Sequence, residues 1–264
     1  MKDQSRAKAG LLAVAVAVLA ALAAGPTWAA TELNPDADEI LRSMSAFLGG
    51  AKAFSVTADI SNEVITREGE KLQWNSSASL LLRRPAGYRA QLHGRFGAAE
   101  LVFDGKRAVL YAKDTNVYVQ REVAGGDNPA LFALIESELG MNLPGVDLLV
   151  ADPYAALAEG VTRSGYHGTA WVSGVKCHHL SFREDEVDWQ IWVATGDRPL
   201  PMKYVITTKW LTGAPQYSVQ LSDWNLAPAV GADAFAFSPP AGAVKRESLA
   251  VDEAGELTQP GETQ

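Results

Sequence analysis

The sequence predicts a mainly β, α+β fold. We expect a strongly curved antiparallel sheet, or unclosed β-barrel, of about ten to eleven strands with helices over its concave face. Hydrophobic and polar residues alternate over many short segments, which is the pattern of half-buried strands. Short turns join these segments, and consecutive strands joined in this way are antiparallel. Helical periodicity is confined to one segment before the strands and one insertion between them.

The first helix is predicted over residues 35–48. Asn34 and Pro35 are residue types favoured at a helix N-cap and at the first helical position. Gly49 and Gly50 end the helix. An apolar stripe recurs at helical spacing and is formed by Ile40, Leu41, Met44, Phe47 and Leu48.

Alternating segments follow this helix. In the first strand Phe54, Val56 and Ile60 alternate with polar residues, and residues 67–70 turn the chain. Asp104-Gly105 fits a tight hairpin turn, because Gly adopts positive φ without steric cost. The other strands before the insertion are predicted at residues 72–83, 88–93, 100–103, 108–111 and 117–120.

A helical insertion interrupts the strands between about residues 128 and 160. Pro129 to Leu139 is predicted as a helix, and Asp152-Pro153 starts a second, short one. Strands resume at residues 165–171, 175–183, 187–194, 201–209 and 216–224. Within the third of these, Trp189, Ile191 and Val193 share one face and Trp192 lies on the other.

Residues 1–29 have the layout of a secretory signal peptide. A basic start, an unbroken apolar run over residues 11–24 and small residues before the expected cleavage near Ala29 are its three parts. We therefore expect a periplasmic protein, with an uncleaved anchor as the alternative. The mature chain is predicted to form one domain over residues 30–245, followed by a disordered acidic tail at residues 246–264.

Composition argues against several kinds of partner. The formal net charge is −8 and no block of Lys and Arg offsets it, so nucleic acid is not an expected partner. Attraction to an anionic membrane is weak for the same reason, which leaves room only for transient membrane contact. Cys177 is the only cysteine, so the chain closes no internal disulfide and the thiol is expected to be buried.

The segment Cys177-His178-His179 is the one candidate for metal binding. On a strand, Cys177 and His179 share a face whereas His178 points to the other face. A third ligand would have to come from His93, His167 or a carboxylate, and nothing in the spacing indicates which. A metal-dependent hydrolase around Cys177 and His179 is therefore a remote alternative. The sequence contains no G-x-S-x-G, P-loop or H-E-x-x-H motif. We therefore expect neither a cofactor nor enzyme activity.

Hydrophobic residues make up 47% of the chain, and the insertion is rich in Leu, Ile, Phe and Met. A curved sheet with an apolar lining, covered by amphipathic helices, can leave a dry cavity for an acyl chain. Binding there needs no catalytic residue, because each buried methylene contributes roughly 0.8 kcal/mol. The same residues would serve a filled core equally well, so composition leaves both interpretations open.

Several segments resemble known families. Four segments of this chain resemble the strand signature of LolA/LolB-like periplasmic lipoprotein carriers. They are Leu82-Arg83-Arg84-Pro85, Tyr88-Arg89, Val102-Phe103-Asp104-Gly105-Lys106 and Leu110-Tyr111. Over roughly residues 35–240 the chain resembles the predicted periplasmic family called domain of unknown function 2092. The segments that carry this second resemblance are Arg84-Pro85, Asp104-Gly105-Lys106, Gly174 with Cys177-His178-His179, residues 187–192, Pro199-Leu200-Pro201 and Pro215-Gln216-Tyr217. The resemblance implies an unclosed barrel whose hydrophobic interior, covered by helices, receives acyl chains. Residues 184–192 have no counterpart in the carriers, so lipoprotein delivery does not carry over.

We therefore expect a non-enzymatic periplasmic binding or carrier protein that holds a lipid, acyl chain or lipoprotein-like apolar ligand. Assigned by alternation, the expected cavity lining is Phe54, Val56, Ile60, Leu80, Leu82, Leu101, Phe103, Trp189 and Ile191. The expected lid is Phe132, Leu134, Ile135 and Leu139. Arg84 and Arg89 are candidates for a lid or headgroup contact, and solvated or salt-bridged strand residues are the alternative. A second hypothesis is an envelope sensor or protein-interaction module on the same fold, with an envelope protein as its partner.

Overall fold

The computed structural model describes residues 32–95, 97–141 and 143–249. The helices are α1 (Pro35–Gly49), α2 (Asn128–Leu139), the 3-10 helix η1 (Val146–Leu148) and α3 (Pro153–Ala158). The strands are β1 (Ala53–Ile65), β2 (Lys71–Arg83), β3 (Tyr88–Gly94), β4 (Gly97–Phe103), β5 (Arg107–Ala112), β6 (Val117–Glu122), β7 (Arg163–Val172), β8 (Val175–Arg183), β9 (Val187–Ala194), β10 (Pro201–Thr208), β11 (Gln216–Asn225) and β12 (Val244–Arg246). The predicted signal peptide and residues 250–264 of the predicted tail lie outside the described residues.

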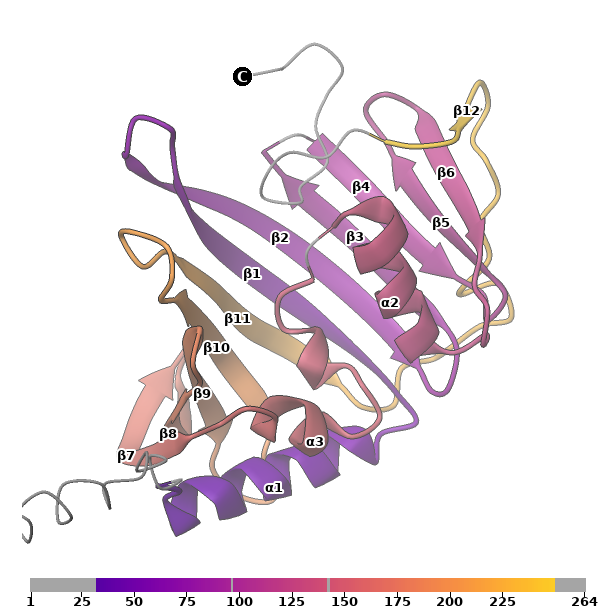
Figure 1. Ribbon diagram of the computed structural model, residues 1–264. Coiled ribbons are helices and arrows are strands. Elements are labelled where there is room, and N and C mark those ends of the chain that lie inside the picture. Colours follow the sequence, from indigo (N-terminus) through magenta and orange to yellow (C-terminus); the bar gives the residue numbers. More distant parts are fainter. Residues whose placement is uncertain (1–31, 96, 142, 250–264) are drawn as a thin grey trace, which may run out of the picture.

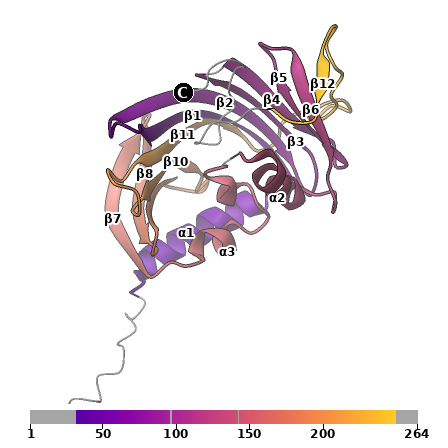
Figure 2. The ribbon, with the colours of Figure 1, turned by 45° about the horizontal axis from the view of Figure 1, so that its top comes forward.

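All twelve strands form one sheet, in the order β12-β6-β5-β4-β3-β2-β1-β11-β10-β9-β8-β7. Within the described residues β12 and β7 do not pair with each other, so the sheet stays open. It arches over the helices, which lie on its concave side (Figures 1 and 2). The fold class predicted from the sequence is confirmed.

Strand β12 is the main departure from the prediction, because it pairs with β6 in parallel. The chain leaves β11 and crosses the convex face of the sheet, where Phe237 contacts the rings of Tyr111 and Tyr118 at centroid distances of 5.6 and 5.5 Å. It then reverses beside Asn116, whose Nδ2 donates to the carbonyl of Ala241 at 3.2 Å. The final strand therefore runs in the same direction as its neighbour.

Helix α1 forms as its sequence predicts. The side chain of Asn34 accepts a hydrogen bond from the backbone N–H of Ala37 at 2.9 Å, which caps the N-terminus. Leu41, Met44 and Leu48 on the predicted stripe are at most 1% exposed. No helix among the described residues is both long enough and apolar enough to cross a bilayer.

Helix α2 crosses the concave side of the sheet near β3 to β5 (Figure 1). Asp127 caps it by accepting from the backbone N–H of Ala130 at 2.9 Å, and Gly140 ends it in the left-handed conformation at φ 64°. Its buried side chains are Asn128, Leu131, Phe132, Leu134 and Ile135. The insertion thus places an apolar helix over the sheet.

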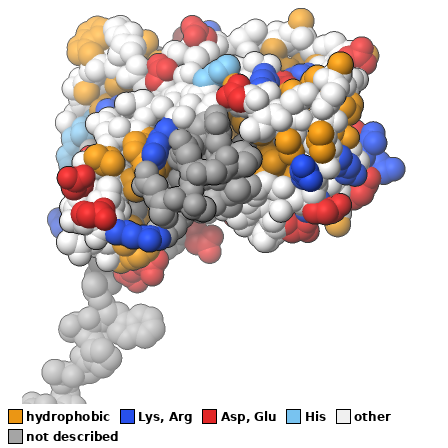
Figure 3. Space-filling view, turned by 90° about the horizontal axis from the view of Figure 1, so that it is seen from above, with side chains coloured by type: hydrophobic (Ala, Val, Ile, Leu, Met, Phe, Trp, Pro, Cys, Tyr) orange, Lys and Arg blue, Asp and Glu red, His pale blue; other side chains and the backbone are white. Residues whose placement is uncertain are grey.

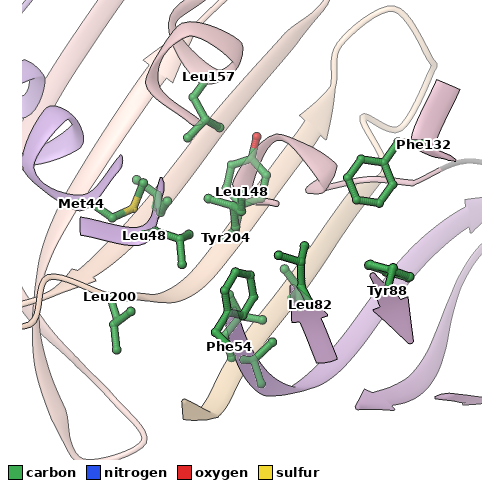
Figure 4. Close-up of a cluster of buried hydrophobic side chains, with 14 of the residues drawn as sticks. Met44, Leu48, Phe54, Leu82, Tyr88, Phe132, Leu148, Leu157, Leu200 and Tyr204 are labelled. Atoms are coloured by element: carbon green, nitrogen blue, oxygen red, sulfur yellow. The ribbon is translucent and has the colours of Figure 1, made fainter. Parts of the chain in front are cut away.

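The two ends of the sheet differ in how they are filled. We call the end where β1 begins and β2 finishes the closed end, and the end where residues 66–70 join β1 to β2 the open end. At the closed end Phe54 faces Leu82 across the two strands, and both are 0% exposed. Figure 4 shows this pair with Met44 of α1 to one side and Phe132 of α2 to the other. The closed end is a packed core.

Candidate functional site

An apolar cavity of about 270 Å³ lies between the concave face of the sheet and the helical insertion. Strands β1, β2, β3, β4, β5 and β11 form its floor. No Asp, Glu, Lys, Arg or His among the described residues lines it. An uncharged, apolar group would fit this lining without leaving a buried charge unpaired.

Small side chains at the centre of the floor make this space. Ala58 lies directly opposite Ala78 across β1 and β2, and Ala90 and Ala99 follow on the same face of β3 and β4. At the closed end the corresponding positions carry Phe54 and Leu82, which fill the interior. Along this face, large side chains at the closed end give way to alanines at the centre, and the space above the alanines is left unfilled.

The roof of the cavity has two parts. Phe132 and Ile135 reach it from α2, and the segment 143–149, which contains η1, contributes Leu143, Val146 and Leu149 among others. Phe132 also meets Tyr88 of the floor edge to face, with ring centroids 5.5 Å apart and planes at 83°. The roof thus consists of one side of α2 and the segment 143–149.

Arg84, which directly follows β2, ties the segment 143–149 to the end of that strand. Its Nη1 donates a hydrogen bond to the carbonyl oxygen of Leu149 at 2.7 Å. Its Nε and Nη2 atoms are buried and have no hydrogen-bond partner among the described residues. Burial lowers the pKa of the Arg84 guanidinium. This residue therefore contacts the roof at Leu149, and its contact with the predicted lid residues or with a headgroup stays a prediction.

The lining of the cavity becomes more exposed along β1 and β2 toward the open end of the sheet, and we call this exposed part the mouth. The lining is buried near the closed end, as at Val56 and Tyr88, and only half-buried at Ile60, Asn62 and Ser76 farther along β1 and β2. Asn62 and Ser76 place an amide and a hydroxyl at this mouth. A ligand with a polar head would thus keep the head at the mouth and its apolar part inside.

The predicted site residues divide into two groups. Those that line the cavity are Val56, Ile60, Leu80, Leu101, Phe132 and Ile135. Those that lie outside its lining are Phe54, Leu82, Phe103, Trp189, Ile191, Leu134 and Leu139. The strand residues of the second group face the concave side as expected but are at most 2% exposed, since they pack against other side chains. That any of these residues contacts a ligand stays a prediction.

Trp189 illustrates the second group. Its ring stacks on Phe182 with centroids 4.0 Å apart and meets Tyr204 edge to face at 5.6 Å. Its Nε1 donates to Glu184 at 2.7 Å. All sides of this indole are occupied by the protein's own groups, so the structure places Trp189 in the core beside the cavity.

Arg89 lies on the convex face, away from the cavity. Its Nε lies 2.8 Å from Glu100 Oε1, and its Nη1 donates to the carbonyl of Ala234 at 3.1 Å. Burial opposes the charge of Glu100, but hydrogen bonds from Arg89 and Gln91 outweigh it and hold the pKa of that carboxyl below its usual value. Arg89 is the salt-bridged strand residue of the alternative interpretation.

Strand β11 supplies lining residues that the sequence did not point to. Tyr217, Val219, Leu221 and Trp224 all face the cavity. Alternation over residues 216–224 predicts the strand, but its place beside β1 brings these residues to the floor, and that pairing joins segments about 150 residues apart. The sequence pattern predicts strand β11 itself, but it does not predict that β11 pairs with β1.

The Cys177-His178-His179 segment has ordinary packing partners. Cys177 is 0% exposed, and its thiol donates to the carbonyl of Val175 at 3.4 Å. His179 stacks on Trp192 with centroids 4.3 Å apart, and its Nε2 lies 2.9 Å from Gln190 Oε1. In the described part of the chain, no three or more His, Cys, Asp or Glu side chains are grouped so as to hold a metal ion.

Two carboxyl groups lie where the roof meets the β8–β9 hairpin. Burial raises the pKa of Asp147 on η1. Burial also raises the pKa of Glu184, the hydrogen bond from Trp189 opposes this rise, and the nearby charge of Asp147 adds to it. Both groups therefore disfavour their ionised forms in the folded protein.

Asp147→Asn is expected to stabilise the protein at pH 7 by on the order of 0.5 kcal/mol. A carboxyl whose pKa is raised in the folded state binds more protons folded than unfolded, so its stabilisation is present at low pH and lost as pH rises through the raised pKa. The free energy of unfolding, measured by urea denaturation from pH 3 to 7, should converge for variant and wild type near pH 3, below the ordinary pKa of 3.8 for this carboxyl. Glu136→Gln on the exposed side of α2 is the control, and an equal effect of the two changes would contradict the assignment.

A family model described as "Predicted periplasmic protein (DUF2092)" matches residues 37–247. Among curated proteins none matches the chain significantly. Among solved structures, the lipoprotein LppX of Mycobacterium tuberculosis is 14% identical, with a TM-score of 0.48 over 75% of this chain and 100% of that chain. LprF from Mycobacterium bovis is 13% identical, with a TM-score of 0.47 over 75% of this chain and 97% of that one. A LolA superfamily protein from Nitrosomonas europaea is 9% identical, with a TM-score of 0.36 over 73% and 94% of the two chains.

Proposed function

This chain belongs to the family of predicted periplasmic proteins called domain of unknown function 2092, and from that premise we propose that it is a non-enzymatic periplasmic protein that binds or carries a lipid by its hydrocarbon chain. The observation that carries the proposal is the uncharged cavity between the sheet and the insertion. Hydrocarbon that enters it leaves water, and each buried methylene contributes roughly 0.8 kcal/mol.

The size and polarity of the cavity narrow the class of ligand. Its volume of about 270 Å³ lies just below the ~300–1,000 Å³ range of ligand pockets, which suits one hydrocarbon chain. Asn62 and Ser76 at the mouth can hydrogen-bond an ester, amide or hydroxyl head. A charged head would have to stay outside, since a buried charge needs a partner that the lining does not supply. The ligand class is therefore a lipid held by one chain with its head at the mouth.

Residues 1–29 fit this proposal as a cleavable signal peptide that directs the chain to the periplasm. We infer that residues 30–245 form the lipid-binding domain and that the cleavage lies near Ala29. A lipid or another apolar ligand is then the primary partner.

A chain-length series tests the proposal. The delipidated protein is loaded with a fluorescent fatty acid, and uncharged n-alkyl alcohols or monoacylglycerols of increasing length compete for the site. We expect affinity to rise about fourfold for each added methylene until the chain fills the cavity, and then to level off. No probe uptake, or competition independent of chain length, would contradict hydrocarbon binding in the cavity.

A further inference from the structure

Large apolar side chains are exposed at the open end of the sheet. Leu72 at the start of β2 is 41% exposed, and Trp210 and Leu211 in the loop after β10 are 67% and 40% exposed. We call these three residues the tip patch. These exposed Trp and Leu side chains present apolar surface to water, and a binding partner could cover that surface.

The two hairpin tips that carry the patch lie side by side. The backbone N–H of Gln216 donates to Glu63 Oε2 at 2.8 Å, and Lys71 Nζ lies 3.1 Å from the same oxygen. A Cβ at Gly213 would lie 3.0 Å from Ile65 Cδ1, so the loop after β10 touches the end of β1. These contacts fix the tips as one continuous surface.

The patch is continuous with the mouth of the cavity. On β2, Leu72 lies opposite Val64, and Trp74 lies opposite Asn62 of the mouth. Because side chains alternate along a strand, all four face the concave side, as does Ile60 in the cavity lining. Three apolar side chains, Leu72, Val64 and Trp74, therefore lead along β1 and β2 from the tips to the polar Asn62 at the mouth.

Charges of both signs lie around the patch. Lys71 pairs with Glu63, and Lys209 beside Trp210 lies 3.0 Å from Asp188. Figure 3, which views the molecule from above, shows basic and acidic side chains interspersed among the exposed hydrophobic ones. With a net charge of −8 for the chain, electrostatic attraction to an anionic surface does not drive docking. The partner of this patch is one that apolar contact recognises.

We propose that the tip patch docks into the interface of a phospholipid bilayer and turns the cavity mouth toward the hydrocarbon. The proposal rests on the proposed function, because it supplies the route by which a lipid chain leaves the bilayer without crossing water. Trp favours the membrane interface, and Leu enters the acyl boundary. Three side chains give weak, reversible binding, on the order of or below the ~10⁴ M⁻¹ of one myristoyl chain. A carrier that must leave the membrane again needs binding of this kind.

Flotation with phosphatidylcholine vesicles tests the docking. The mature protein should float with the vesicles, and the double variant Trp210→Ser/Leu211→Ser should lose at least about tenfold in partitioning. Trp171→Ser is the matched control: Trp171 is 71% exposed but lies beside the β7–β8 turn at the closed end, so its variant should float like wild type. Raising salt from about 50 to 500 mM should change wild-type partitioning less than about twofold. Circular dichroism confirms that each variant is folded.

Three outcomes would overturn the docking proposal: no flotation of the wild-type protein, equal losses in the Trp171 and Trp210/Leu211 variants, or loss of flotation at high salt. A concentration-dependent dimer that the double variant abolishes, without vesicle binding, would assign the patch to a second copy of this chain. Binding of a soluble fluorescent fatty acid in buffer is measured in parallel on the same proteins. Flotation without probe binding would refute the proposed function and leave docking standing. Probe binding without flotation would refute the docking proposal and leave the proposed function standing.

Discussion

Ala78→Phe is expected to abolish most acyl-chain binding and leave the fold intact. Ala78 lies on the cavity floor directly opposite Ala58, so a phenyl ring there occupies the space that a ligand would use. If the ring displaces about four methylenes, the loss of binding free energy is about 3 kcal/mol, on the order of 100-fold in affinity. Filling an existing cavity costs little stability and often adds some. Competition with the fluorescent fatty acid measures the affinity, and urea denaturation measures the stability.

Ser79→Phe is the matched control for this change. Ser79 is the next residue on the same strand, is exposed, and points to the convex face. Its variant should bind the probe with wild-type affinity. Equal binding by the Ala78→Phe and wild-type proteins would show that the ligand does not occupy the cavity.

Leu82→Ala is expected to reduce the free energy of unfolding by about 2–5 kcal/mol. Leu82 is 0% exposed and faces Phe54 in the packed closed end, so its removal leaves a void that the neighbours cannot fill. The folded fraction should bind the fluorescent probe as the wild type does. Urea denaturation gives the first quantity, and probe titration under native conditions gives the second.

Leu80→Ala provides the comparison, since Leu80 lies two residues earlier on the same face but lines the cavity and is half-buried. This variant should lose less stability than Leu82→Ala and should bind the probe about tenfold more weakly or with a preference for longer chains. The reverse pattern, with the binding loss at Leu82 and the larger stability loss at Leu80, would contradict the division between core and cavity.

Local patterns in the sequence predict most of the fold. Period-two alternation and short turns place the strands. The end signals at Asn34 and Gly50 bound the first helix, because such signals depend on neighbouring residues alone. Strand β12 could not be predicted from local patterns. It is three residues long, and it pairs with β6 only because the chain first crosses the convex face. No local pattern records that crossing.

The site is less predictable than the fold because alternation gives the face of a residue and not what covers it. Trp189 and Leu101 both face the concave side, yet Phe182 and Tyr204 cover the first while the second borders the cavity. Composition leaves a filled core and a cavity equally open, and the structure contains both, one at each end of the sheet. The change from filled core to cavity occurs where Ala58 pairs with Ala78, and this pairing depends on strand register.

Native mass spectrometry of the protein isolated from its own cell envelope tests the central claim most directly. We predict the mass of the chain without residues 1–29 plus that of one bound lipid, which is released when the protein is denatured. The Ala78→Phe variant, isolated in the same way, should carry no lipid. A wild-type protein that appears only at its own mass, and takes up no fluorescent fatty acid when one is supplied, would contradict the account.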